Sequence, residues 1–413
     1  MISVEEALNT ILSGCRELGL EKVDILEAGG RVIGENVTAL RDIPSAANSA
    51  MDGYAVQSAD TKGAQALKPA ELKVIETIAA GTLAKKTVKT GEAARIMTGA
   101  VIPKGADAVV RREDTEETGK TVKIKIAAPR GLDIRFPGED VQKGEQVIAA
   151  GSVLRPGHIG MLSALGKSFV SVYQKPRVAI LSTGDELVDI ETVPPPGKIV
   201  NSNSYSLAAQ VLECGGVPVL LGIGRDQKAE LAQKFRIARR ADVILSSGGV
   251  SVGDYDFVKD VMGDIGNAMH FWQVAMRPGK PLAYGSIDGV PLFGLPGNPV
   301  SVMVSFEQFV RPYLLKMQGY SRIFRPILRA VSAQDIKKSS GFKNFIRALV
   351  YEKEDAYIAS ITGEQGSGIL KSMVAANGFI VLREKDTFIG KGDEVMVQLI
   401  DETFTRTPYP RFR

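Results

Sequence analysis

Side chains that commonly act as nucleophiles or metal ligands are scarce in this sequence of 413 residues. Its two cysteines, Cys15 and Cys214, lie far apart in apolar helical contexts, which excludes a disulfide framework and the ligand spacing of a zinc site. Two histidines, His158 and His270, argue against histidine-based acid–base or nucleophilic catalysis. The chemistry must therefore rest on carboxylates, basic groups and backbone amides, with a divalent ion as a further candidate.

Long apolar runs and concentrated charge are also missing. No apolar run approaches the ~20 residues that cross a bilayer, and the N-terminus lacks the charged-then-apolar pattern of a signal peptide. The 51 Lys and Arg residues exceed the 47 Asp and Glu residues by only four, and they are dispersed, unlike the concentrated basic face of nucleic-acid-binding proteins. We therefore expect a cytoplasmic protein in a reducing setting that binds neither membranes nor nucleic acid.

The chain has more residues than a single hydrophobic core usually contains, so several domains are expected. Residues 1–43 and 137–174 are predicted to form one elongated linking domain. Between them, residues 44–136 contain short alternating apolar runs separated by glycine-containing turns, which predicts an inserted β-rich domain. Residues 175–322 carry the clearest pattern, and residues 323–413 are typical of a small C-terminal β domain.

Residues 177–181, 217–223 and 242–245 are predicted strands that are apolar throughout. They alternate with predicted helices, one over residues 228–240 and one that begins at the capping segment 201–204. Strands without alternation indicate a parallel sheet whose two faces are both covered by helices. In such a sheet, ligands bind beyond the carboxyl ends of the strands.

Five loops follow the predicted strands and hold most of the polar candidates: Ser182–Leu187, Arg225–Asp226, Ser246–Gly253, Met276–Pro281 and Gly294–Ser301. In Ser246–Gly253, glycines would let backbone amides approach an anion, and the helix start behind the loop would favour negative charge. The alternative is that these glycines only satisfy positive φ angles. Neither a Walker A nor a dinucleotide-binding motif is present, which disfavours ordinary NTP or NAD binding.

Four carboxylates belong to the same predicted edge: Asp185, Glu186, Asp254 and Asp256. They would repel one another and any anionic ligand unless a cation lies among them, and hard oxygen ligands suit Mg²⁺. Asp226 is a fifth candidate, and a helix N-cap is the alternative explanation of its position.

Several short motifs are distributed along most of the chain. In sequence order they are Asn48–Ala55, Met97–Ala100 with Gly105–Val110, Ser182–Leu187, Ser246–Gly253, Arg277–Pro281 and Gly294–Ser301. Together they closely resemble the molybdopterin molybdenumtransferase family, which comprises MoeA and the E domain of gephyrin and its plant relatives. The resemblance implies an α/β multidomain fold. The fold would consist of a parallel-sheet, MogA-like molybdopterin-binding domain, the inserted β-rich domain, the elongated linking domain and a C-terminal β-barrel-like domain.

The resemblance also implies an activity: insertion of molybdate into adenylylated molybdopterin, assisted by Mg²⁺, with release of AMP. It implies a homodimer in which the β-rich domain of one subunit leans over the α/β site of the other. Contacts with the molybdopterin adenylyltransferase and with acceptor enzymes would follow.

The residues implied as catalytic are Asp52, Thr98, Glu186, Asp226, Asp256 and Arg277, with Glu186, Asp226 and Asp256 as the metal ligands. Those implied as substrate-binding are Asp185, Ser246, Ser247, Gly248, Gly249, Ser251, Gly253, Lys280, Pro296, Gly297, Asn298 and Pro299. Peripheral contributors are Arg135, Asp140 and Ser367.

One departure concerns Gln273, where family members often carry a lysine. A neutral amide cannot replace an ammonium group in balancing an oxyanion, so the oxyanion site is less well defined than the pterin site. Three alternatives stay open: tungsten in place of molybdenum, a mainly scaffolding role, and the preceding adenylyl-transfer step.

Overall fold

The computed structural model describes residues 1–225, 227–249, 270–401 and 404. Contacts divide the chain into two compact units, one comprising Met1–Glu21 with Tyr173–Arg413 and the other Lys22–Val172. None of the helices in the described ranges has the length and apolar character that crossing a bilayer requires.

Unit 1 contains a six-stranded sheet in the order β16-β13-β17-β21-β20-β18. Four strands are parallel: β13 (Arg177–Thr183), β16 (Val217–Gly224), β17 (Val243–Ser247) and β21 (Val290–Leu295). This confirms the predicted parallel sheet. The next strand, β20 (Pro281–Ile287), runs antiparallel to β21. The last strand, β18 (His270–Gln273), runs antiparallel to β20 and so in the direction of the four parallel strands. The reversal follows from Asp288 and Gly289, whose φ angles of 49° and 82° fit the two-residue turns that join hairpins.

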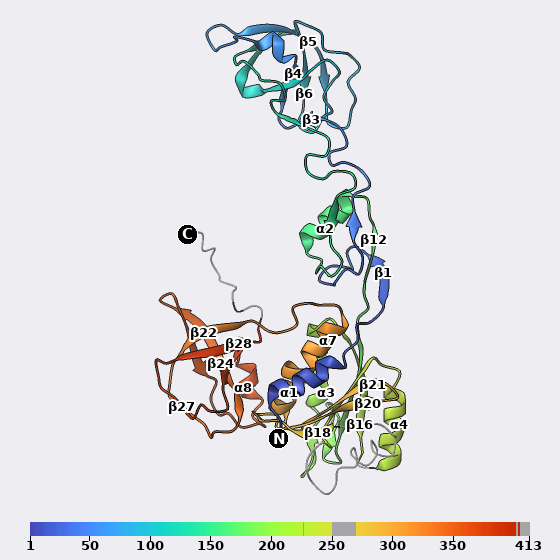
Figure 1. The fold of residues 1–413 in the computed structure, drawn as a ribbon, viewed down its shortest axis with the longest axis vertical. Helices are drawn as coiled ribbons and strands as arrows, with labels where there is room; N and C mark the ends of the chain where they lie inside the picture. The colour runs from blue at the N-terminus through green and yellow to red at the C-terminus, as the bar shows by residue number, and fades with distance from the viewer. Residues whose placement is uncertain (226, 250–269, 402–403, 405–413) are drawn as a thin grey trace. The chain divides into compact units, whose positions relative to one another are not determined.

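Both faces of this sheet are covered. On one face, Val178 and Ile180 of β13 pack in a core with four helices: α1 (Val4–Ser13), α3 (Asn203–Glu213), α6 (Pro299–Ser305) and α7 (Arg311–Met317). The intervening Ala179 and Leu181 pack on the opposite face against α4 (Lys228–Ala238). Figure 1 shows α4 on one side of the sheet and α1, α3 and α7 on the other. Successive side chains of a strand point to opposite faces of the sheet. A strand that is covered on both faces is therefore apolar at every position, which explains the continuous apolar runs.

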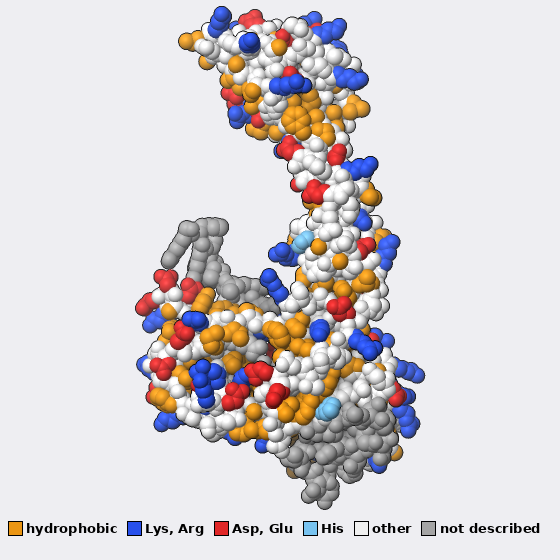
Figure 2. Space-filling model, viewed as in Figure 1, with side chains coloured by type: hydrophobic (Ala, Val, Ile, Leu, Met, Phe, Trp, Pro, Cys, Tyr) orange, Lys and Arg blue, Asp and Glu red, His pale blue; other side chains and the backbone are white. Residues whose placement is uncertain are grey.

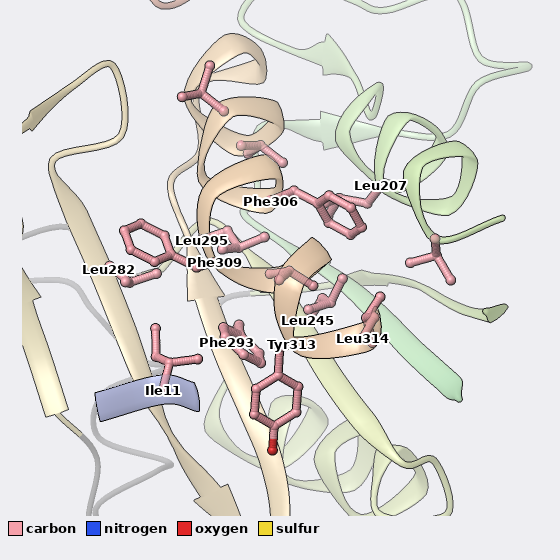
Figure 3. Packing of buried hydrophobic residues seen from close by; sticks show 14 of the residues in the cluster. Ile11, Leu207, Leu245, Leu282, Phe293, Leu295, Phe306, Phe309, Tyr313 and Leu314 are labelled. Atoms are coloured by element: carbon pink, nitrogen blue, oxygen red, sulfur yellow. The ribbon is translucent and has the colours of Figure 1, made fainter. Parts of the chain in front are cut away.

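The larger core contains Leu207, Leu245, Phe293, Leu295, Phe306, Phe309, Tyr313 and Leu314 (Figure 3). Ile11 of α1 packs into it as well. The Ser3 hydroxyl accepts a hydrogen bond from the Glu6 amide, and the Glu6 carboxylate accepts one from the Ser3 amide, which caps this helix. The predicted domain boundaries stay a prediction, but α1 itself packs in unit 1, because its apolar face completes this core.

The C-terminal part of unit 1 is a closed barrel. Its strands are β22 (Ile327–Ser332), β24 (Lys343–Lys353), β25 (Ala356–Ile361), β26 (Gly378–Leu382) and β28 (Glu394–Leu399). They pair in the order β24-β25-β22-β28-β26, and β26 also pairs with β24, which closes the ring. The predicted β-barrel-like domain is confirmed. The short helix α8 (Lys371–Val374) and the strand pair β23 (Ile336–Lys337) and β27 (Phe388–Ile389) complete this part.

Unit 2 is dominated by a six-stranded sheet in the order β7-β4-β6-β5-β9-β8. The strands are β4 (Gly53–Val56), β5 (Ala70–Ile78), β6 (Glu92–Ile96), β7 (Ala108–Arg111), β8 (Thr115–Thr118) and β9 (Thr121–Ile124). Successive residues of β4 alternate between two cores, Tyr54 and Val56 in one and Ala55 in the other. The predicted β-rich character of this segment is confirmed.

The rest of unit 2 consists of short elements: β1 (Leu20–Asp24) with β12 (Phe169–Tyr173), β2 (Val37–Thr38) with β11 (Gln146–Ile148), β3 (Asn48–Ser49) with β10 (Ile134–Arg135), and α2 (Pro156–Ala164). On the face in Figure 2, Lys and Arg side chains alternate with Asp and Glu side chains.

Candidate functional site

The four parallel strands of unit 1 bring their following loops to one edge of the sheet. The Gly184 amide donates to the Gly224 carbonyl oxygen at 3.2 Å, which joins the loops after β13 and β16. The Gly248 amide donates to the Leu295 carbonyl oxygen at 3.1 Å, which joins the loops after β17 and β21. The described residues of these four predicted loops, 182–187, 225, 246–249 and 294–301, therefore lie at one edge of the sheet, as the parallel topology requires.

The fifth loop reaches the same edge by a different route. Because β20 and β18 are antiparallel, Pro281 begins β20 and Gln273 ends β18 where the parallel strands end, and these two residues are register partners. The Val274 amide donates to the Lys280 carbonyl oxygen at 2.8 Å, so the intervening segment forms a compact loop. Arg277 and Lys280 are exposed in it. The edge thus carries two cations beside the glycine-containing loops.

The loop after β13 presents Asp185 and Glu186, and both side chains are exposed. The Asp185 carbonyl oxygen accepts from Lys198 Nζ at 2.6 Å and from Arg225 Nη1 at 3.2 Å, which holds the loop backbone. Short strands β14 (Leu187–Val188) and β15 (Ile199–Val200) pair directly behind it. The Glu186 carboxylate folds back over Gly184, where an added Cβ would collide with both of its oxygens.

Ser246 and Ser247 end β17 and are both buried. Ser247 Oγ accepts a hydrogen bond from Asn203 Nδ2 at 2.7 Å, and the same amide donates to the Gly297 carbonyl oxygen at 2.7 Å. Asn203 therefore ties α3 to two loops of the edge. Ser246 Oγ is buried and has no hydrogen-bond partner among the described residues.

Two glycines at the edge cannot carry a side chain. Gly248 has φ of +90°, and a Cβ there would lie 2.7 Å from the Thr183 carbonyl oxygen. Gly279 has φ of +100°, and its Cβ would lie 2.7 Å from Ser305 Oγ. Gly249, with φ of +66°, also needs the left-handed conformation. Gly248 and Gly249 thus have the positive φ angles that both readings of this loop allow, and anion binding by their amides stays a prediction.

The loop after β21 contacts the C-terminal barrel. Pro296 is buried, whereas Gly297 and Asn298 are exposed and Pro299 begins α6. The Val300 amide donates to the Ser367 carbonyl oxygen at 3.1 Å, so the predicted residue Ser367 does lie beside this loop.

Buried Arg347 of β24 holds the barrel segment that contains Ser367. Its guanidinium donates to the Gly366 carbonyl oxygen and to Ser372 Oγ, both at 3.0 Å. Burial lowers the pKa of Arg347 to about 10.

In unit 2, Asp52 and Thr98 form a pair. The Thr98 amide and the Thr98 hydroxyl each donate to Asp52 Oδ1 at 2.7 Å. These two hydrogen bonds hold the pKa of the exposed Asp52 carboxyl below its ordinary value, with a smaller contribution from Arg112. Two candidates that lie far apart in the sequence are thus adjacent.

Arg135 and Asp140 share a pocket of ≈ 480 Å³ within unit 2, lined also by Ile43, Pro44, Asn48 and Glu139. Asn48 begins the motif Asn48–Ala55, so the pocket joins that motif to two peripheral candidates. Its mixed charge, with one guanidinium and two carboxylates, does not favour a simple anion.

Four candidates, Asp226, Ser251, Gly253 and Asp256, lie outside the described residues, as does Asp254. Within the described ranges no group of three His, Cys, Asp or Glu side chains could enclose a metal ion. Glu186 is the metal-ligand candidate that the structure describes, an exposed carboxylate at the sheet edge.

Sequence reasoning missed several residues that shape the edge. It assigned Asn203 only to a capping segment and gave no role to Lys198 or Arg225, although each donates hydrogen bonds to an edge loop. It also missed Ser339 and Phe342 of the barrel, which contact Arg277. No local signal could have found these two, because they follow Arg277 by more than sixty residues.

Comparisons with family models cover most of the chain. Residues 2–166 match the MoeA N-terminal region (domain I and II), residues 179–316 a probable molybdopterin binding domain, and residues 329–400 the MoeA C-terminal region (domain IV).

Similar proteins span nearly the whole length. A molybdopterin molybdenumtransferase of Nostoc is 38% identical over 96% of this chain and 93% of its own, and one of Bacillus subtilis is 36% identical over 97% and 94%. The crystal structure of a molybdopterin biosynthesis moeA protein from Pyrococcus horikoshii matches with a TM-score of 0.82 at 34% identity, covering 97% of this chain and all of that one. The chain therefore belongs to the molybdopterin molybdenumtransferases, a family of transferases of molybdenum cofactor biosynthesis.

Proposed function

We propose that the chain inserts molybdenum from molybdate into adenylylated molybdopterin and releases AMP. The observation that carries the proposal is the convergence, at one sheet edge, of the Arg277 and Lys280 cations with the glycine-containing loop after β17 and the carboxylates after β13. The relatives bear the name of this activity.

The reaction brings negative charges together, since molybdate is a dianion and the pterin carries a pyrophosphate and a dithiolene. Such a cluster requires preorganised cations and amide donors. Arg277 and Lys280 would supply positive charge, and the amides of Gly248 and Gly249 would supply donors. Holding the reactants together would overcome their repulsion and account for much of the catalysis.

Mg²⁺ would be held by Glu186 together with Asp226 and Asp256. The exposed Glu186 carboxylate at the sheet edge offers the hard oxygen donor that this ion prefers. When bound, Mg²⁺ would neutralise charge on the pyrophosphate. Asp185 lies beside Glu186, and its backbone is held by Lys198 and Arg225, which would keep the carboxylate of Glu186 near the edge.

A homodimer would complete the site. In this arrangement, Asp52 and Thr98 of a second copy would approach the α/β edge, with Arg135 and Asp140 as more distant contributors. Hydrogen bonds from Thr98 lower the pKa of Asp52, and its carboxylate would bind a cation or orient an attacking oxygen. The adenylyltransferase and acceptor enzymes are proposed as further partners.

A reducing, cytoplasmic setting is part of the proposal. Cys15 and Cys214 are both free thiols, and burial raises their pKa to about 11 and about 12. Thiols held in the protonated form are poor nucleophiles and poor metal ligands.

The test is incubation of the purified chain with adenylylated molybdopterin, Mg²⁺ and either molybdate or tungstate, with AMP release followed over time. Release that depends on molybdate supports the proposal, and faster release with tungstate would change the metal assigned. A chain that never releases AMP with either oxyanion would contradict the proposal and favour the scaffolding role. The Glu186→Gln variant, assayed over a range of Mg²⁺ concentrations, separates loss of metal binding from loss of pterin binding.

A further inference from the structure

The C-terminal barrel reaches into the candidate site through the segment Lys338–Phe342. The Arg277 guanidinium carbon lies 4.1 Å from the centroid of the Phe342 ring, and Lys280 Nζ lies 6.0 Å from the same centroid. Arg277 Nη1 also donates a hydrogen bond to Ser339 Oγ at 3.0 Å. Two side chains of the barrel thus contact the cations of the sheet edge.

Several backbone contacts fix this segment against the edge loop. Strand β19 (Met276–Arg277) pairs in parallel with β24, with Arg277 opposite Asn344, and the Lys343 amide donates to the Ala275 carbonyl oxygen at 2.8 Å. Phe342 directly precedes β24. The ring and the guanidinium are therefore neighbours because their backbones are hydrogen-bonded strands.

Lys338 stabilises the backbone of the segment Lys338–Phe342. Its Nζ donates to the carbonyl oxygens of Phe342 at 2.9 Å and of Glu384 at 3.4 Å. The Gly341 amide also donates to the Glu384 carbonyl oxygen, at 2.8 Å. Lys338 thereby acts as a structural cation, whereas Arg277 and Lys280 keep their charges at the surface.

Within the part of the chain that the structure describes, the two surface cations have no acidic partner. Among the described residues, no Asp or Glu side chain lies within ion-pair distance of Arg277 or Lys280. Two like charges that share one aromatic ring repel each other, and the negative face of the ring offsets only part of that repulsion. A dianion placed between them would remove it, so the arrangement suits an anionic ligand.

We propose that Phe342 and Ser339 are positioning residues that hold Arg277 and Lys280 as a paired receptor for a tetrahedral oxyanion. The inference rests on the proposed function and deepens it, since it gives the C-terminal barrel a part in oxyanion binding. The aromatic ring sets the plane of the guanidinium, and the Ser339 hydroxyl sets its rotation within that plane.

The first test measures binding of molybdate, and separately of inorganic phosphate, to the full chain by equilibrium dialysis. Phe342→Leu keeps apolar volume but removes the aromatic face, and we expect affinity for the oxyanion to fall about three- to fivefold. Phe342→Tyr should retain binding, because it keeps an aromatic ring. Tyr351→Leu, which removes an exposed ring from the far end of β24, is the matched control and should bind as the unaltered chain does.

The second test asks whether Phe342 acts through Arg277. In an Arg277→Ala background, Phe342→Leu should cause little further loss, because the ring no longer has its guanidinium to position. Additive losses would overturn the inference, as would unchanged affinity in both Phe342→Leu and Ser339→Ala. Weakening for phosphate alone would support the receptor and assign it to the phosphates of the pterin substrate.

Turnover provides the comparison with the proposed function. If the unaltered chain releases AMP, Phe342→Leu should raise the KM for molybdate about as much as it weakens binding, with kcat within about twofold. If the unaltered chain binds oxyanions but releases no AMP, the proposed function fails while the dialysis results still decide the receptor.

Discussion

The sheet edge of unit 1 and the Asp52–Thr98 pair of unit 2 position polar groups in opposite ways. At the sheet edge, Ser247 and Asn203 are buried, and Gly248 packs against the strand beside it. In unit 2, an exposed carboxylate is oriented by two hydrogen bonds from one residue. The polar groups of the first arrangement are buried, whereas the carboxylate of the second is exposed to solvent.

This difference separates stability from chemistry. A change at the buried part of the sheet edge should weaken folding and ligand binding together, since the same contacts serve both. A change at Asp52 or Thr98 should alter protonation and catalysis with little effect on folding. Substitutions can break or sharpen the contrast.

The largest effect is expected for Gly248→Ala. The new Cβ would meet the Thr183 carbonyl oxygen at 2.7 Å in a backbone with φ of +90°, so the free energy of unfolding should fall by about 4 kcal/mol. Trp272 of β18 is the only tryptophan, so its fluorescence reports unfolding of this domain in urea. Gly222→Ala, with φ of +74° and open space around it, should lose only about 1 kcal/mol. Equal losses would show that backbone strain alone governs both sites.

Lys280→Ala should affect chemistry almost alone. If this exposed cation faces the developing charge as proposed, its removal should slow AMP release about 100-fold, equivalent to about 2.7 kcal/mol. The urea midpoint should stay unchanged, and Lys353→Ala on the exposed end of β24 serves as the control. Undiminished AMP release would remove Lys280 from the site.

Asn203→Ala should produce an intermediate effect on both properties. It deletes the donor to Ser247 Oγ and to the Gly297 carbonyl oxygen, and we expect a loss of about 2 kcal/mol in unfolding free energy with weaker pterin binding. Ser206→Ala on the same helix removes a single local hydrogen bond and should change stability by less than about 0.5 kcal/mol. A stable Asn203→Ala protein with weakened binding would show that the two properties can be separated here too.

The smallest effect is expected for Thr98→Val. The Asp52 carboxyl loses the hydroxyl donor but keeps the amide donor, so its pKa should rise part of the way towards its ordinary value. A group with a lowered pKa contributes stability above its unfolded pKa of about 4, and this contribution is lost as the pH falls through the folded value. The stability of Thr98→Val should therefore differ from that of the unaltered chain only near and above that range, and slightly.

Carbon NMR titration of the aspartate carboxyl groups measures this pKa, and Thr98→Ser, which keeps the hydroxyl, is the control. An unmoved Asp52 pKa in Thr98→Val would mean that the backbone amide alone sets its ionisation.

Apolar periodicity was enough to predict the sheet. Residues 178–181 and 243–245 are buried on both faces, as their unbroken apolar sequence predicts, whereas the run at 217–223 forms an edge strand in which Val217 and Leu220 are exposed. The same reasoning placed Arg277 and Lys280 at the edge of the sheet where the parallel strands end, because loop position follows from strand order. Strand direction at β20 was not foreseen, although Asp288-Gly289 carries a recognisable turn signal.

Contacts between distant segments could not be predicted in the same way. The docking of α1 on the core of unit 1 and the stacking of Phe342 on Arg277 depend on which surfaces meet after folding. Burial of Ser246 and Ser247 was missed for a related reason. Both hydroxyls belong to the last residues of strand β17. At the end of a strand, a shift of one residue decides whether a side chain lies in the core or in the loop.

The hairpin of β20 and β21 sets a fixed length between two parts of the ligand edge. The chain leaves Lys280, runs away along β20, turns at Asp288-Gly289 and returns along β21 to Pro296. An inserted residue in either strand would shift one loop past the other and reverse the faces of the side chains beyond it. We therefore expect homologous chains to vary in length at this turn and to keep the number of residues in both strands constant.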